Sequence, residues 1–232
     1  MLQLDQLTLT QDDFHLTADW SAGLGSRIAL MGPSGAGKST LLSAIAGFFA
    51  PTGGAIRWQG RDLRDTPPGD RPVTILFQDQ NLFPHLTVAQ NLGLGLRPDL
   101  RLTAEDNARI DGALDRTGLA GLGPRRPAQL SGGQASRAAL ARALLRARPI
   151  LLLDEPFAAL GPALRQEMLA LVREVADATG ALVLMVTHDP EDARALGGQL
   201  AFIADGIVQP PADTTSLLAD PPPALRAYLG PK

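Results

Sequence analysis

The sequence predicts an α/β fold in which helices pack on a mostly parallel sheet. Two observations support this: short apolar runs alternate with segments whose apolar residues recur at helical spacing, and a glycine-rich loop joins one such run to one such helix. Alternating strands and helices favour parallel pairing, because each helix returns the chain to the same edge of the sheet. The 232 residues are enough for one sizeable domain, and we expect a single domain over residues 1–232.

The first part of the chain predicts strands that lead into the glycine-rich loop. Apolar and polar residues roughly alternate in two segments joined by a polar turn, and two shorter apolar runs follow, which gives expected strands at residues 2–9, 14–20, 27–31 and 73–77. Between the last two strands, apolar residues at helical spacing predict a helix that ends near Gly47.

The remainder of the chain is first helical and then alternating. From about residue 79 to 136 the pattern is helical, with loops rich in glycine and proline, which predicts a helical subdomain. Strands and helices alternate again after it, at residues 150–153, 163–179, 181–186, 190–196 and 200–204.

Composition excludes several classes of function. The formal net charge of -3 argues against a dedicated nucleic-acid binder, and the absence of cysteine excludes disulfides, thiol catalysis and Cys-ligated zinc. The N-terminus lacks a basic and apolar signal segment, and apolar runs such as 181–186 fall far short of the ~20 residues that span a bilayer. We therefore expect a soluble, cytoplasmic protein that needs another chain for any membrane spans.

The glycine-rich loop matches the phosphate-binding P-loop pattern and lies between a predicted strand and a predicted helix. Glycines let backbone N–H groups curl around a phosphate, and the helix N-terminus adds a favourable dipole. Lys38 is expected to reach the β- and γ-phosphates of ATP, and the Ser39 hydroxyl to bind Mg²⁺. The predicted nucleotide-binding residues are Gly32, Pro33, Ser34, Gly35, Ala36, Gly37, Lys38, Ser39 and Thr40.

Three further strand ends carry polar side chains suited to hydrolysis. Asp154 and Glu155 follow a strand of four apolar residues, so Asp154 is expected at the Mg²⁺ and Glu155 beside the attacking water. His188 ends another core strand and is expected to contact the γ-phosphate. Gln78 ends a third strand and can bind Mg²⁺ or water through its amide. Alone, the acidic pair could be a helix cap and Gln78 could be structural; with the P-loop, we predict Glu155, His188 and Gln78 as catalytic and Ser39, Gln78 and Asp154 as metal-binding.

A second anion site is predicted outside the P-loop. Leu130 precedes Ser131, Gly132, Gly133 and Gln134, which open another helix with backbone N–H groups and a hydroxyl. One chain therefore has two phosphate-binding surfaces, which need not belong to the same active site.

The P-loop, Gln78, the segment 130–134, the acidic pair and His188 occur in the order and spacing that resemble the ATPase subunits of ABC transporters. The resemblance covers nearly the whole chain. It implies a RecA-like P-loop NTPase core, an N-terminal antiparallel β subdomain and a helical signature subdomain. It also implies a head-to-tail homodimer that sandwiches two ATP molecules, so that Ser131, Gly132, Gly133 and Gln134 of one copy face the γ-phosphate held by Lys38 of the other.

The resemblance further implies a translocase whose ATP hydrolysis drives a membrane permease served by a periplasmic substrate-binding protein, at the cytoplasmic face of the inner membrane. Two positions depart from the family. Gln11 stands where an aromatic residue usually stacks on adenine, with Phe14 the nearest aromatic, and Gly161 replaces the Asp that normally links the two sites. Base stacking and communication between the sites stay open.

Within the family the chain is most similar to the ATPases of bacterial thiamine importers, through stretches at residues 71–73, 76–78, 81–83, 85–88 and 91–96. That similarity implies thiamine or its phosphate esters as cargo, although no residue of an ATPase subunit touches cargo. Importers for ferric iron, sulfate, molybdate or polyamines share the catalytic motifs and are alternatives.

Two non-transport functions are further alternatives. A DNA-repair or chromosome-organising ATPase would carry a long coiled coil, and the chain has no heptad run. A P-loop kinase would not need the segment 130–134. Just after Gln78, an apolar cluster of Phe83, Pro84 and Leu86 predicts the permease contact, unless Phe83 belongs to the core of the helical region.

Overall fold

One mixed sheet of eleven strands runs through the residues that the computed structural model describes, 1–79 and 81–230. Its order is β5-β4-β1-β2-β10-β9-β3-β8-β7-β6, and β11 pairs with β9. The strands are β1 (Leu2–Gln11), β2 (Phe14–Ala22), β3 (Arg27–Met31), β4 (Gly53–Trp58), β5 (Arg61–Asp62), β6 (Val73–Leu76), β7 (Ile150–Asp154), β8 (Leu182–Val186), β9 (Gln199–Ala204), β10 (Ile207–Val208) and β11 (Ala212–Asp213). The helices are α1 (Lys38–Ala46), α2 (Val88–Gly93), α3 (Ala104–Arg116), α4 (Gly132–Leu145), α5 (Pro162–Thr179), α6 (Pro190–Leu196), α7 (Thr214–Ala219) and α8 (Pro223–Leu229), with a 3₁₀ turn at Pro127–Gln129.

The parallel half of the sheet, β9-β3-β8-β7-β6, confirms the predicted α/β core. Every residue of β7 and β8 is buried, which explains their uninterrupted apolar runs. The register sets Leu30 of β3 opposite Val186 of β8, and Val186 opposite Asp154 of β7. Because the C-terminal ends of these parallel strands are aligned, the loops that follow them meet at one edge of the sheet.

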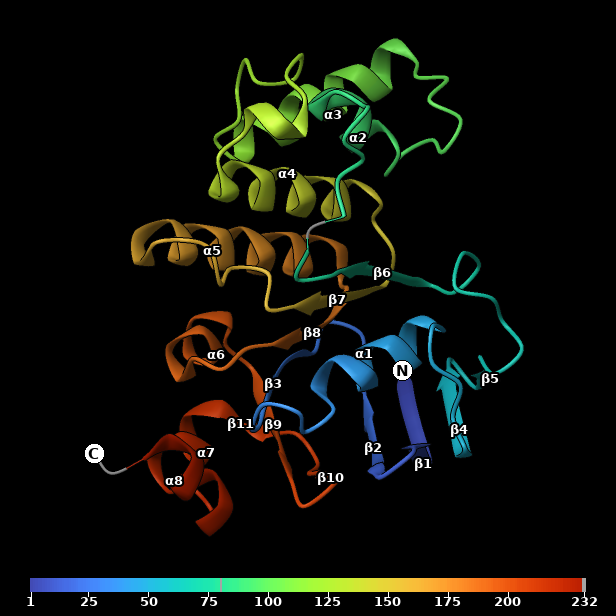
Figure 1. The fold of residues 1–232 in the computed structure, drawn as a ribbon, viewed down its shortest axis with the longest axis vertical. Helices are drawn as coiled ribbons and strands as arrows, with labels where there is room; N and C mark the ends of the chain where they lie inside the picture. The colour runs from blue at the N-terminus through green and yellow to red at the C-terminus, as the bar shows by residue number, and fades with distance from the viewer. Residues whose placement is uncertain (80, 231–232) are drawn as a thin grey trace.

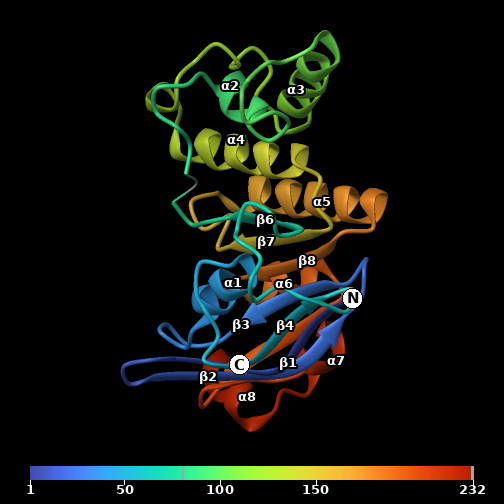
Figure 2. The same ribbon diagram turned by 90° about the vertical axis from the view of Figure 1, so that its right-hand side faces the viewer.

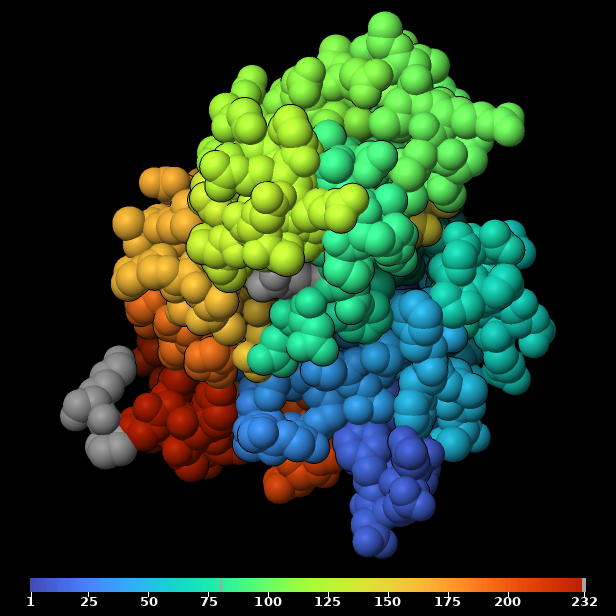
Figure 3. Space-filling view, turned by 45° about the horizontal axis from the view of Figure 1, so that its top comes forward, coloured from blue at the N-terminus to red at the C-terminus, as the bar shows by residue number. Residues whose placement is uncertain are grey.

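The antiparallel half is built on the β1–β2 hairpin, and β1 also pairs with β4. The hairpin protrudes from the molecule (Figures 2 and 3). The two-residue strand β10 joins the halves, since it pairs in parallel with β2 and antiparallel with β9. The four strands β4, β5, β10 and β11 were absent from the sequence prediction. The three shortest have only two residues each, too few to show a period.

The helices α2, α3 and α4 form a separate layer at one end of the molecule (Figure 1). Their own core includes Leu92, Ile110 and Ala138, whereas Leu140 on α4 packs into the core shared with α5 and the sheet. Each of the three helices begins with a capping box, at Thr87, Thr103 and Ser131 respectively. Helix α4 runs past residue 136, so this one helix serves both the helical layer and the core; the subdomain boundary of 79–136 stays a prediction.

A buried arginine fixes the C-terminal end of α1, the helix that follows the P-loop. Arg71 is 3% exposed and donates to the carbonyl oxygens of Ala44 at 2.8 Å and Ile45 at 2.9 Å, and to those of Leu63 and Thr66. These bonds satisfy carbonyls that a helix end leaves without partners. Burial lowers the pKa of the Arg71 guanidinium. Among the described residues, no helix combines the length and apolarity needed to cross a membrane.

Candidate functional site

A cavity of about 490 Å³ opens at the edge where the parallel strands end. It brings together the P-loop, Gln78, Glu155 and His188, as the sequence predicted from separate strand ends. Two aromatic side chains also line it. The full lining is Phe14, Gly32, Ser34, Gly35, Gly37, Lys38, Ser39, Thr40, Gln78, Glu155, His188 and Tyr228. The other two P-loop residues, Pro33 and Ala36, supply backbone to the loop without lining the cavity.

The P-loop has the left-handed backbone that its glycines allow. Gly35 has φ +78° and Gly37 has φ +95°, and Gly37 is the N-cap of α1. Lys38 Nζ donates to the carbonyl oxygens of Gly32 at 2.7 Å and Pro33 at 2.8 Å, which holds the ammonium across the loop. Burial lowers the pKa of Lys38, while the negative charges of Glu155 and Asp154 raise it. A cradle of N–H groups with one held cation suits a polyphosphate.

Exposed Ser39 and buried Asp154 form a pair of oxygen ligands beside the P-loop. Asp154 is 7% exposed, and the Ser39 hydroxyl donates to its carboxylate. Burial raises the pKa of Asp154, and the hydrogen bond from Ser39 and the charge of Lys38 lower it. Within the described residues, no three His, Cys, Asp or Glu side chains converge as a metal cage. Oxygen donors with a single carboxylate fit Mg²⁺, which takes its other ligands from phosphate and water.

Glu155 leaves the strand by a strained turn. Its φ is +45°, a left-handed value rarely adopted by a residue with a side chain, while its N–H donates to Val186 O at 3.2 Å. The turn puts Asp154 under the P-loop and Glu155 in the cavity. Glu155 Oε2 lies 3.6 Å from His188 Nδ1, too long for a hydrogen bond. Both groups thus line the same part of the cavity.

A network behind His188 was missed by sequence reasoning. Arg165 on α5 pairs with Asp189 at 2.9 Å, and lies 3.7 Å from Asp192. The Thr187 hydroxyl donates to Asp192 at 2.8 Å. Arg165 and Asp192 are thereby fixed on both sides of the loop that carries His188. Only the fold reveals the network, because α5 and α6 approach each other in space and not in sequence.

Phe14 is the aromatic residue nearest to Gln11, the position at which the family usually has an aromatic residue. Its ring packs on the P-loop so closely that a Cβ on Gly37 would stand 2.5 Å from it, whereas Gln11 is exposed. Phe14 lines the cavity at the P-loop, at the tip of β2. At Gly161 the backbone is extended, and a Cβ there would meet nothing within 4 Å. That position therefore has space for a side chain, and packing does not require a glycine.

The segment 130–134 does not join the cavity of its own chain. Ser131 is the N-cap of α4 and accepts a bond from the N–H of Gln134 at 3.3 Å, while Gln134 Oε1 accepts from the N–H of Ser131 at 3.0 Å. None of the residues Leu130 to Gln134 is among the described residues that line the P-loop cavity. The two phosphate-binding surfaces predicted from the sequence are separate in one chain.

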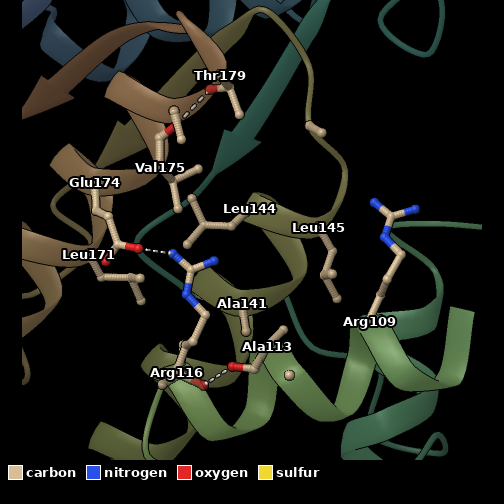
Figure 4. Close-up of a pocket in the computed structure, with 14 residues that line it drawn as sticks. Arg109, Ala113, Arg116, Ala141, Leu144, Leu145, Leu171, Glu174, Val175 and Thr179 are labelled. Carbon is tan, nitrogen blue, oxygen red and sulfur yellow. Dashed lines mark hydrogen bonds and ion pairs between the residues drawn. The ribbon is translucent and has the colours of Figure 1, made fainter. Parts of the chain in front are cut away.

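Two other cavities lie away from the P-loop. One of about 390 Å³ includes Phe83, which is 46% exposed and is not part of the core, together with Phe48 and Arg146. The other, of about 440 Å³, lies between α3, α4 and α5. Apolar side chains line it, and Arg116 pairs with Glu174 across it at 2.8 Å (Figure 4). Both charged groups are largely exposed, so this pair adds little stability.

Known proteins similar to this chain point to one family. The family described as "ABC transporter" matches residues 17–158. The thiamine import ATP-binding protein ThiQ of Cereibacter sphaeroides is 68% identical over 231 residues and covers 100% of each chain. The proteins of that name from Ruegeria sp. and Yersinia pseudotuberculosis are 55% and 48% identical, over 99% and 94% of this chain and 100% and 92% of theirs.

A solved structure shares the fold. The dimeric ATP-binding cassette MJ0796 in a post-hydrolysis state with ADP and Pi superposes with a TM-score of 0.82 at 30% identity. The match covers 92% of this chain and 99% of that one.

Proposed function

The chain belongs to the ABC transporter family, and on that premise we propose that it is the ATP-hydrolysing subunit of an importer for thiamine or its phosphate esters. The observation that carries the proposal is the convergence of P-loop, acidic pair, Gln78 and His188 on one cavity. The cargo is supported by the 68% identity with a thiamine import ATP-binding protein over the whole length. Importers of ferric iron, sulfate, molybdate or polyamines are the second candidates, since they would use the same catalytic residues.

Hydrolysis in this proposal needs two copies of the chain. The P-loop cavity of one chain lacks the segment 130–134 among its described lining, and that segment has its own N–H donors at a helix start. A head-to-tail homodimer would set Ser131, Gly132, Gly133 and Gln134 against a nucleotide held by the partner's P-loop. A related cassette with the same fold is dimeric.

The chemistry assigns a role to each side chain. Lys38 and the P-loop N–H groups would bind the phosphates, and Phe14, which lines the same cavity, would contact the base. Ser39, Asp154 and Gln78 would hold Mg²⁺, which neutralises charge on the β- and γ-phosphates when bound. Glu155 accepts a proton from the attacking water, and His188 donates to the terminal phosphate. The strained Glu155 turn keeps its carboxylate in the cavity and apart from buried Asp154.

Uptake of labelled thiamine tests the cargo. Deleting the gene in its host is expected to abolish uptake at nanomolar supply, because the permease loses its source of energy. A plasmid copy should restore uptake, and a Lys38→Ala copy should not. Uptake of iron and sulfate, measured in the same cells, should be unchanged. Loss of iron or sulfate uptake with thiamine uptake intact would reject the cargo and leave the ATPase assignment standing.

We further propose that a membrane partner binds the cavity of about 390 Å³ that includes Phe83, which is a groove on the surface. The groove lies between the helical layer and the sheet, and Phe48 and Phe83 both expose apolar rings there, at 60% and 46%. The buried amide of Asn91 fixes the Phe83 loop by bonds to both the N–H (2.7 Å) and the carbonyl (3.1 Å) of Phe83. A short cytoplasmic segment of the permease would bury these rings. The subunit would then work as a peripheral protein on the cytoplasmic face of the inner membrane, in a complex with a periplasmic substrate-binding protein.

Phe83→Asp is expected to uncouple transport from hydrolysis. The charge would prevent an apolar partner from binding, while the nucleotide cavity, which does not include Phe83, is unchanged. Thiamine uptake and co-purification with the permease should fall at least about tenfold, and the basal ATPase rate should stay near wild type. Leu24→Asp is the matched control, since Leu24 is 54% exposed, precedes β3 and is absent from the lining of the groove. Normal assembly and transport by Phe83→Asp would place the contact elsewhere.

A further inference from the structure

The C-terminal helix α8 brings an unexpected side chain to the nucleotide cavity. Tyr228, the only tyrosine of the chain, lines the same cavity as Lys38, Glu155 and His188. Helix α8 lies beside α7 at the end of the molecule opposite the helical layer (Figure 1). Nothing in the P-loop chemistry described above uses this residue.

Packing fixes where Tyr228 lies. Leu225, one turn earlier on α8, is fully buried, and the Tyr228 ring packs against Phe202 with ring centroids 5.5 Å apart at 54°. Phe202 on β9 pairs with Met31, the residue directly before Gly32 of the P-loop. The tyrosine ring therefore packs on the neighbour of β3, the strand that leads into the P-loop. With its ring body packed, the side chain is half-buried and contributes to the cavity wall.

Tyr228 shares its part of the molecule with Glu155, since both line the cavity and the two groups interact electrostatically. Burial raises the pKa of Tyr228, and the negative charge of Glu155 raises it further. A phenol in this environment stays protonated at neutral pH and is a hydrogen-bond donor. The carboxylate of Glu155 at the same end repels a phosphate, so a triphosphate there needs donors to offset this repulsion.

We propose that Tyr228 is a further nucleotide-binding residue, whose hydroxyl donates a hydrogen bond to the terminal phosphate of bound ATP. Helix α8 thereby distinguishes a nucleoside triphosphate from a diphosphate. The inference rests on the proposed ATPase function, and it adds a contact from the C-terminal helix to the P-loop site. A bond from a neutral donor to a charged phosphate is worth about tenfold or more in affinity.

The single tyrosine allows a direct test by ¹⁹F NMR. Protein made with 3-fluorotyrosine gives one resonance, and the Glu155→Gln background prevents turnover during the measurement. ATP is expected to shift this resonance, and ADP to shift it much less, because ADP lacks the terminal phosphate. An equal shift with both nucleotides, or none with either, overturns the proposal. Adding Ser131→Arg, which blocks closure of the dimer, should leave the ATP shift in place. A shift that disappears in this double variant would reassign Tyr228 to the dimer interface and also overturn the direct contact.

Tyr228→Phe tests the hydroxyl alone, because the ring still packs against Phe202. In the same Glu155→Gln background, equilibrium dialysis should show about tenfold weaker binding of ATP and unchanged binding of ADP. Arg226→Ala is the control on α8, since it removes exposed bonds to Asp220 and to the carbonyl oxygen of Pro221, and Arg226 does not line the cavity. Equal weakening of both nucleotides, or of neither, contradicts a bond to the terminal phosphate. If the parent Glu155→Gln protein binds no ATP at all, the ATPase proposal fails instead, so the two failures are distinguishable.

Discussion

Glu155→Gln is expected to lower the rate of ATP hydrolysis by about 10²-fold or more, because the amide cannot accept the proton of the attacking water. Binding should persist, since the P-loop, Lys38 and the Ser39–Asp154 pair are unchanged. A variant that binds ATP without hydrolysing it should accumulate as an ATP-bound dimer. Phosphate release measures the rate of hydrolysis, and equilibrium dialysis measures ATP binding. Light scattering with ATP and Mg²⁺ measures the accumulation of the dimer.

Glu167→Gln is the matched control for this prediction. Glu167 lies exposed on α5, so the substitution makes the same change of charge and amide outside the cavity. It should hydrolyse ATP at the wild-type rate. Wild-type turnover by Glu155→Gln would remove the residue from the mechanism, and the strained turn that places it in the cavity would then need another explanation.

Ser131→Arg and Lys38→Ala are each expected to abolish hydrolysis when alone and to complement each other partly when mixed. In a shared-site dimer, each homodimer has the same defect at both sites. The heterodimer has one site with both defects and one site with the intact Lys38 and the intact Ser131. With random pairing, half the dimers are mixed and half their sites work, so about a quarter of the wild-type rate is the upper limit.

The complementation experiment needs a control for helix capping. Ser131→Arg also removes the N-cap of α4, a loss of about 1 kcal/mol. Thr103→Arg removes the corresponding cap of α3 outside both phosphate-binding surfaces and should stay active. ATPase assays over a range of mixing ratios measure the recovery. Full activity of either variant alone would rule out a site shared between two chains.

Local sequence patterns predicted which residues meet at the P-loop cavity. A P-loop, Asp154–Glu155, Gln78 and His188 each follow an apolar run, and parallel strands bring their ends to one edge whatever their order in the sheet. The prediction of a nucleotide site therefore needed only the strands and the residues after them. The second anion site at Ser131 could also be predicted from the sequence, because its N-cap and glycines are adjacent in the chain.

Tertiary structure alone decided the features that depend on contacts between distant segments. Arg71 caps α1, Phe14 packs on Gly37 and Tyr228 reaches the cavity from α8; no periodicity in the chain records these contacts. The two-residue strand β10 exists only because β2 and β9 supply its partners. A sequence pattern specifies which face of a segment is buried, because that follows from its own period. It cannot specify which segment covers that face, because the packing partner is selected by the fold as a whole.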